Sequence, residues 1–167
     1  KQERIALTTV IKHAIESAKP FIEADEHHLN ASLPDDPIMV DGDMDRLTQV
    51  FANLLNNAAK YTNKGGEISV EVSCSGNDAV VAVRDNGIGI PRDMLSRVFE
   101  MFAQVKNPLR RSQDGLGIGL NLVRTLVKMH QGSVEARSEG LGKGSEFIVR
   151  LPVSRSDSPS VQSDPVA

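Results

Sequence analysis

One segment of the sequence carries polar side chains of a kind that can bind metal and phosphate. On a helix, Asn53, Asn57 and Lys60 would lie within about 60° of one another, beside an apolar stripe. Asparagine is a poor helix former, so local stability does not explain why Asn56 occurs here as well. Amide oxygens can ligate Mg²⁺, and a lysine one turn further along can contact a phosphate. Taken alone, the stripe fits a solvated helix edge with local asparagine caps at least as well.

A second candidate site follows a predicted strand, where the sequence reads Asp85-Asn86-Gly87-Ile88-Gly89. A carboxylate at a strand end can accept a hydrogen bond from an exocyclic amine, and glycines let a flat ring approach the backbone closely. A simple turn is an equally good interpretation, because Asn-Gly is also a common hairpin signal.

A glycine-rich turn opens a predicted helix further along, at Gly115-Leu116-Gly117-Ile118-Gly119. Free amides and the helix dipole at such a turn can bind phosphate. The turn is not the dinucleotide fingerprint, because Leu120 stands where glycine or alanine is required. A Walker A loop is also absent, since Lys143 is not followed directly by serine or threonine. The alternative for the turn is tight helix packing.

The other reactive residue types do not form a recognisable site. His27 and His28 are adjacent and His130 is distant in sequence, so they lack metal-ligand spacing and are predicted to be surface residues. Cys74 has no partner to activate it and is predicted to be a small strand residue. No Gly-x-Ser-x-Gly occurs, so nothing indicates that type of serine hydrolase.

Hydrophobic periodicity predicts the elements that must position these residues. Helical spacing covers 7–26, 43–61, 92–99 and 115–130. Strand alternation covers 29–33, 38–40, 67–73, 79–84, 133–138 and 145–151. The polar segment 103–114 lacks periodicity and is predicted to be a long loop of the kind that forms lids. Adjacent strand pairs read as hairpins, which predicts a two-layer α/β (α+β) sandwich, a mixed sheet of about five strands covered on one face by about three helices.

Composition is typical of one globular domain. The chain of 167 residues is 40% hydrophobic and 25% charged, so we expect a domain over 1–153 and a Ser/Pro-rich disordered tail or linker over 154–167. A net charge of −3 and an aromatic content of 4% argue against binding to nucleic acid or an anionic membrane. The apolar runs are too short to span a membrane. Because the chain begins at Lys1 and not at Met, we expect it to be a piece of a longer protein.

In order and spacing, these segments resemble the ATP-binding catalytic domain of two-component sensor histidine kinases, in the superfamily that includes gyrase, the Hsp90 chaperone and MutL. The resemblance covers 7–152. Its motifs are the N box at 53–62, the G1 box at 85–90, the F box Phe99-Glu100-Met101-Phe102, the G2 box at 115–120, and a G3 element at 142–145 with Phe147. Each motif alone is ambiguous, whereas five in order make coincidence implausible.

The resemblance implies a role for each matching residue. Asn57 with Asn53 would hold Mg²⁺ against the triphosphate, and Lys60 with Tyr61 would contact phosphate and ribose or base. Asp85 would accept a hydrogen bond from the adenine amino group. The base pocket would be completed by Gly87, Gly89, Ile90 and Phe102, with Ser145 acting through water.

The resemblance also assigns the phosphate end of the site. The loop 103–114 would be the ATP lid, from which Arg110 or Arg111 would reach the γ-phosphate. Asp114 stands at the position where the family often has a glycine before the G2 box. The phosphates would be cradled by Gly115, Leu116, Gly117, Ile118, Gly119 and Leu120.

The implied activity is transfer of the γ-phosphoryl group from ATP to a histidine, in which the protein supplies positioning and charge stabilisation. The sequence contains no phosphoacceptor box, and His13 does not fit one. The expected partners are therefore a dimerisation and phosphoacceptor domain outside this chain and a response regulator receiver domain, in a cytoplasmic setting with or without a membrane anchor on the whole protein. The tail could link to a receiver domain, as in hybrid kinases.

Two other functions compete with this interpretation. An ATPase clamp of the same superfamily usually carries glutamate at the position of Asn53, and an amide cannot act as the base that activates water. A nucleotide-sensing or protein-docking module without catalysis would not need the complete set of ligand residues found here.

Overall fold

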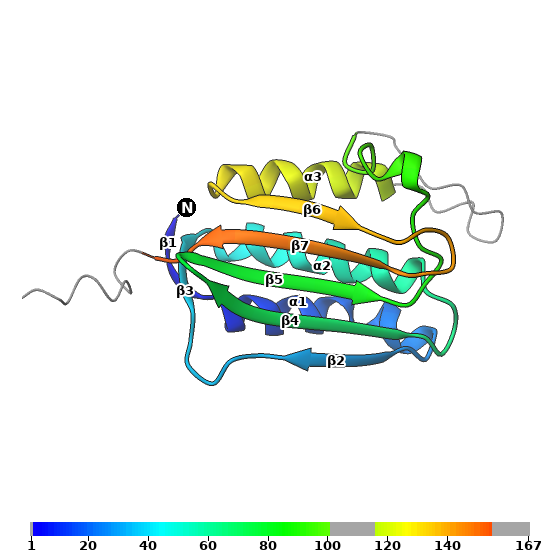
Figure 1. The fold of residues 1–167 in the computed structure, drawn as a ribbon. Coiled ribbons are helices and arrows are strands. Elements are labelled where there is room, and N and C mark those ends of the chain that lie inside the picture. The colour runs from blue at the N-terminus through cyan, green and yellow to red at the C-terminus, as the bar shows by residue number, and fades with distance from the viewer. Residues whose placement is uncertain (1, 101–115, 155–167) are drawn as a thin grey trace, which may run out of the picture.

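A five-stranded sheet forms one layer of the protein and three helices form the other, in a computed structural model that describes residues 2–100 and 116–154 (Figure 1). The helices are α1 Leu7–Ala24, α2 Met44–Lys60 and α3 Leu116–Met129, with a short 3-10 helix η1 Arg92–Met94. The strands are β1 Glu3–Ala6, β2 His28–Ser32, β3 Met39–Gly42, β4 Glu67–Ser75, β5 Asp78–Asp85, β6 Ser133–Arg137 and β7 Ser145–Pro152. The predicted two-layer sandwich is confirmed.

The sheet is mixed, as predicted. Its strand order is β2-β4-β5-β7-β6, in which β2 runs parallel to β4 and the other neighbours are antiparallel. The β4–β5 hairpin turns between Ser75 and Asp78, where Gly76 has a φ of 62°. Figure 1 shows the three helices on one face of the sheet, with the other face bare.

The buried face of each element follows its sequence pattern. In α1 the buried stripe consists of Leu7, Val10, Ile11, Ala14, Ala18 and Ile22. In β5, Ala79, Val81 and Val83 are buried on alternate positions. Burial of these aliphatic side chains is the dominant favourable term in folding. The core is therefore aliphatic, as the low aromatic content predicts.

The largest local differences from the prediction lie in short segments. The helix predicted at 92–99 is wrong beyond η1, because turns follow Met94. Strand β1 has no alternating pattern and was not predicted; it exists because it pairs antiparallel with β3. Helix α1 continues through Pro20 and ends at Ala24, two residues before the predicted end.

A small two-stranded sheet closes one end of the sandwich. β1 pairs with one edge of β3, and Val153 bridges Val40 from the other side. The backbone amide of Ser154 donates to the carbonyl of Met39 at 2.7 Å. The first and last described segments therefore meet at this end, on either side of β3.

No helix in the described part of the chain is both long and apolar enough to cross a membrane.

Candidate functional site

Helix α2 carries Asn53, Asn56 and Asn57. Asp43 caps its N-terminus, accepting from the amide of Arg46 at 3.1 Å. Asn53, Asn57 and Lys60 are half-buried beside the apolar stripe. Asn57 Nδ2 and Asn56 Oδ1 are buried without a hydrogen-bond partner among the described residues. A buried polar atom left unsatisfied costs free energy, and this favours a ligand-binding edge over a purely structural one.

Asp85 ends β5 on the same face as the buried Val81 and Val83, because side chains alternate along a strand. Its Oδ1 accepts from the amide of Gly87 at 2.8 Å, and its Oδ2 accepts from the hydroxyl of Ser145 at 2.9 Å. Ser145 therefore contacts Asp85 directly, while its predicted water-mediated contact with the base stays a prediction. Burial raises the pKa of Asp85, and the hydrogen bonds from Gly87 and Ser145 oppose that shift. The site therefore holds a desolvated, oriented carboxyl group.

The turn after Asp85 is seated against the end of α2. The amide of Ile88 donates to the carbonyl of Tyr61 at 3.0 Å. A Cβ on Gly87 would lie 2.2 Å from that carbonyl oxygen and 2.8 Å from Thr62 Oγ1, so no other residue fits without a shift. Asn86 Oδ1 accepts from the amide of Glu67 at 2.8 Å and fixes the same turn to β4. This turn therefore joins the strand that carries Asp85 to the helix that carries the asparagines.

The loop between β6 and β7 supports the turn from the other side. Gly89 has a φ of 78°, and a Cβ there would lie 2.1 Å from the carbonyl oxygen of Gly140. The amide of Gly142 donates to the carbonyl of Ile88 at 2.7 Å. Ser138 Oγ accepts from the amide of Ile90 at 3.0 Å and donates to the carbonyl of Gly144 at 2.7 Å. Ser138 was not predicted, because serine is common in loops and its partners are distant in sequence.

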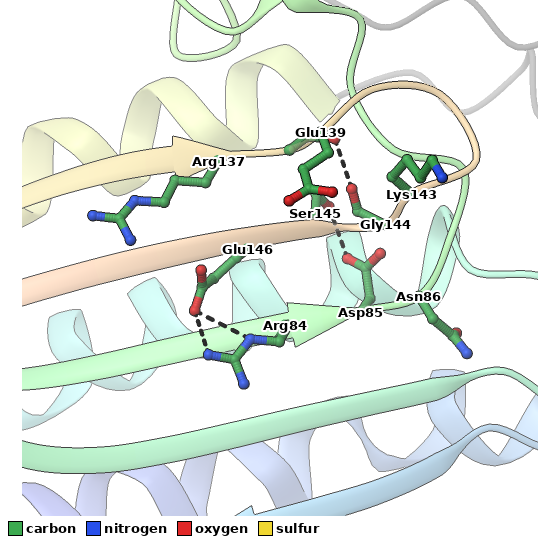
Figure 2. A pocket seen from close by; sticks show the side chains of 10 residues that line it. Arg84, Asp85, Asn86, Arg137, Glu139, Lys143, Gly144, Ser145 and Glu146 are labelled. Carbon is green, nitrogen blue, oxygen red and sulfur yellow. Dashed lines mark hydrogen bonds and ion pairs between the residues drawn. The ribbon is translucent and has the colours of Figure 1, made fainter.

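A hollow of about 560 Å³ opens beside Asp85 (Figure 2). Arg84, Glu146 and Arg137 line it from the bare face of the sheet, and Arg84 Nε donates to Glu146 Oε2 at 3.2 Å. The hollow reaches Asp85 and Ser145 but no residue of α2. It is large enough for a small ligand, yet it meets only one part of the candidate site.

The structure brings the predicted base-recognition residues together. Asp85, Gly87, Gly89, Ile90 and Ser145 converge at one end of the sheet, with Tyr61 against the turn.

The phosphate end of the predicted site is described only in part. Phe102, Arg110, Arg111 and Gly115 lie outside the described residues, as does the lid at 103–114. Leu116, Gly117 and Ile118 form the backbone of the first turn of α3, followed by Gly119 and Leu120, so the glycine-rich segment does open a helix. A Cβ on Gly119 would meet no described heavy atom within 4 Å. Tight packing therefore does not explain this glycine within the described part of the chain.

The prediction of surface histidines is wrong for two of them. His27 is 8% exposed and His130 is 4% exposed, whereas His28 is on the surface. The partners of His27 lie 35 residues away, and His130 Nε2 accepts from the distant amide of Asp43, although its Nδ1 bonds locally to the carbonyl of Leu126. The long-range contacts have no local signal in the sequence. Residues 2–100 and 116–154 hold no cluster of three or more histidine, cysteine or carboxylate side chains placed to bind a metal ion. Cys74 lies in β4, as predicted, and is exposed.

Sequence comparison finds curated relatives among sensor kinases. The sensor histidine kinase AtsR of Burkholderia thailandensis is 43% identical over 77% of this chain and 22% of its own length. The sensor protein SrrB of Staphylococcus aureus is 38% identical over 66% of this chain and 19% of its own length. The chain thus spans about a fifth of the length of these curated relatives.

Solved structures with the same fold come from the same group. The mycobacterial sensor histidine kinase MprB superposes with a TM-score of 0.78 at 27% identity, covering 90% of this chain and 98% of that one. A full-length ShkA in complex with AMPPNP superposes with a TM-score of 0.78 at 26% identity, covering 92% of this chain and 31% of that one.

Residues 42–155 match the family described as histidine kinase-, DNA gyrase B- and HSP90-like ATPases. This segment contains α2, the Asp85 turn, α3 and the Gly144 loop, which are the parts that build the site. The chain therefore belongs to this ATPase family, as an ATP-binding catalytic domain of the sensor histidine kinase type.

Proposed function

We propose that the domain binds Mg·ATP through Asp85 and α2 and transfers the γ-phosphoryl group to a histidine on a dimerisation and phosphoacceptor domain outside this chain. A response regulator receiver domain would then take the phosphoryl group, and the reaction would be cytoplasmic. The observation that supports the proposal most is the half-buried Asp85 carboxyl group, held by Gly87 and Ser145. An ionised carboxylate there accepts a hydrogen bond from the exocyclic amine of adenine.

Helix α2 supplies the second half of the proposal. Asn57 is half-buried, and its Nδ2 is a buried donor without a partner among the described residues, which leaves it available to a ligand acceptor. The oxygen of the same amide is of the type that ligates Mg²⁺. Asn57 and Asn53 would hold the ion, with Lys60 placed one turn further for phosphate. When bound, Mg²⁺ neutralises charge on the phosphate oxygens. Full-length ShkA, of which 31% superposes on this chain, was solved in complex with AMPPNP, and this supports nucleotide binding as part of the proposal.

The residue types favour transfer over hydrolysis. In the transfer, the bond between the γ-phosphorus and the β,γ-bridging oxygen breaks, a phosphorus–nitrogen bond forms on the acceptor imidazole, and ADP leaves. Hydrolysis requires a base that activates water, and the Asn53 amide cannot serve as one.

The direct test uses this chain, γ-labelled ATP, Mg²⁺ and a separately supplied phosphoacceptor domain. We expect acid-labile phosphohistidine on the acceptor and none on the chain itself. Asn57→Ala should abolish transfer, while Asn30→Ala, an exposed asparagine on β2, should leave it unchanged. Transfer by Asn57→Ala at the normal rate would refute the metal assignment. Fast ATP turnover without an acceptor would instead indicate an ATPase clamp, and phosphohistidine on the isolated chain would refute the need for a separate acceptor.

A further inference from the structure

His27 is a buried ring in the short connection between α1 and β2, close to the turn that follows Asp85. Its Nε2 lies 2.9 Å from the carbonyl oxygen of Thr62 and 3.2 Å from that of Asn63. Carbonyl oxygens only accept hydrogen bonds, so Nε2 carries the hydrogen and donates to the chain just after α2. Nδ1 is buried and has no partner among the described residues, so the ring is held through Nε2 alone.

The connection that contains His27 also forms backbone hydrogen bonds with the segment that follows α2. The amide of His28 donates to the carbonyl of Gly66 at 2.9 Å, and the amide of Gly65 donates to the carbonyl of Asp25 at 2.9 Å. Segment 62–66 is thereby tied to segment 25–28 by backbone and side chain together. The side-chain part of this junction includes the two contacts of His27 Nε2, with the carbonyls of Thr62 and Asn63.

The Asp85 turn rests on this fixed segment. Gly87 approaches Tyr61 and Thr62 so closely that no Cβ would fit, and the amide of Ile88 donates to the carbonyl of Tyr61. The amide of Gly87 in turn donates to Asp85 Oδ1 at 2.8 Å. A shift of the α2 end would therefore move the turn and, with it, one of the two donors that orient the carboxylate.

We propose that His27 is a positioning residue for base recognition. Its hydrogen bonds fix the end of α2, the turn at Gly87 packs against that end, and this turn orients the Asp85 carboxylate. This inference rests on the proposed function, in which Asp85 accepts from the adenine amine. It makes a specific claim about ligand selectivity: loss of the Nε2–H donor weakens the preference for an amino group at that position more than it weakens nucleotide binding in general.

The experiment compares binding of ADP with that of inosine diphosphate, which carries an oxygen in place of the amino group. The selectivity ratio is the dissociation constant of inosine diphosphate divided by that of ADP. It is measured by calorimetry on the full 167-residue chain, at mildly alkaline pH and well below the unfolding temperature. We expect His27→Ala to lower this ratio by about fivefold to tenfold, the equivalent of one neutral hydrogen bond. His27→Gln should restore the ratio to within about twofold, because its amide nitrogen reaches the position of Nε2.

Two other histidines serve as controls. His130→Ala removes a buried histidine at the opposite end of the sandwich, and should lower stability without changing the ratio. His28→Ala removes the exposed histidine next to His27 and should change neither the stability nor the ratio. If His130→Ala lowers the ratio as much as His27→Ala, the effect is one of general stability and the proposal is refuted.

A second pair of variants keeps the test decisive if His27→Ala does not fold. His27→Asn places its amide only as far as the Nδ1 position, so it should show the low ratio while His27→Gln does not. Equal ratios for these two variants would refute the role of the Nε2–H donor. A wild-type chain that binds both nucleotides equally would refute base recognition by Asp85 itself, whereas a selective wild type with an equally selective His27→Ala would refute only the role of His27.

Discussion

The two ends of the sandwich differ in whether their buried polar atoms have hydrogen-bond partners. At the end where β1 and Ser154 lie, here called the termini end, His130 uses both ring nitrogens. Nδ1 donates to the carbonyl of Leu126 at 2.8 Å, and Nε2 accepts from the amide of Asp43 at 3.1 Å. At the end that carries Asp85, His27 Nδ1, Asn56 Oδ1 and Asn57 Nδ2 are buried without a partner in the described chain. Thr48 Oγ1, near the start of α2, is an exception to this division.

This difference separates structural polar groups from polar groups kept for a ligand. A satisfied buried network stabilises one arrangement, while unsatisfied donors and acceptors cost stability until something binds them. Asp85 lies between the two kinds, because each of its oxygens accepts a hydrogen bond, from Gly87 and Ser145, while burial still raises its pKa. Substitutions at the Asp85 end should therefore change binding more than stability, and substitutions at the termini end should do the reverse.

The strongest test of this contrast is Asp85→Asn. The amide cannot supply a charged acceptor to the base, so we expect ADP affinity to fall by about tenfold to hundredfold. The free energy of unfolding should change by no more than about 1 kcal/mol, because replacing a desolvated carboxylate by a neutral amide offsets the weaker bonds to Gly87 and Ser145. Calorimetry and urea unfolding measure the two quantities on one sample. A large loss of stability with intact affinity would reverse the contrast.

His130→Ala should show the opposite result. It leaves the amide of Asp43 without its acceptor and opens a cavity, and we expect a loss of about 2–4 kcal/mol of unfolding free energy. ADP affinity should stay within about twofold of the wild type. Gly42→Ala gives a linked control, since its Cβ would lie 2.7 Å from His130 Cδ2; its destabilisation should be smaller in the His130→Ala background. Additive effects of the two substitutions would argue against this packing.

The pH dependence of ADP binding should follow the ionisation of Asp85. The pKa of Asp85 is raised above its ordinary value of 3.8, and a base amine needs the ionised form, so ADP affinity should fall as pH drops through that raised pKa. Between the ordinary pKa and the raised one, the folded protein without nucleotide holds a proton on Asp85 that the unfolded chain has released. Asp85 therefore lowers the free energy of unfolding of the nucleotide-free domain as pH rises through this window. Titrations of ADP affinity against pH in wild type and Asp85→Asn check this, and any dependence that both share comes from groups other than Asp85.

The smallest effect on stability is expected for Glu135, which lies on the face of the sheet opposite the helices. Hydrogen bonds from Arg150 and Arg137 lower the pKa of Glu135, so its contribution to stability is present above the ordinary carboxyl pKa and is lost as pH falls through the lowered one. The carboxylate is well exposed, and Glu135→Gln should cost less than about 1 kcal/mol and less still in high salt. Thermal unfolding at low and high ionic strength measures this. Any change in ADP affinity would show that the face is not independent of the site.

The main elements and their buried faces could be predicted from the sequence because they are properties of neighbouring residues. The stripe of α2, the Asp43 cap and the alternation of β5 each lie within one segment. The 92–99 helix was predicted for the same reason and is wrong past Met94, since a short apolar pattern does not suffice for a helix without tertiary packing. β1 shows the converse, because only its pairing with β3 makes it a strand.

By itself, the sequence determined the fold class, the order of the motifs and the family to which they belong. Only the tertiary structure decided that His27 and His130 are buried, that Ser138 organises the loop after β6, and that Ser145 contacts Asp85 directly. The physical reason is the separation of the partners. His27 meets the chain 35 residues away, Ser145 meets Asp85 across 60 residues, and His130 meets Asp43 across 87. Such contacts depend on how the layers pack, which no local pattern of residues records.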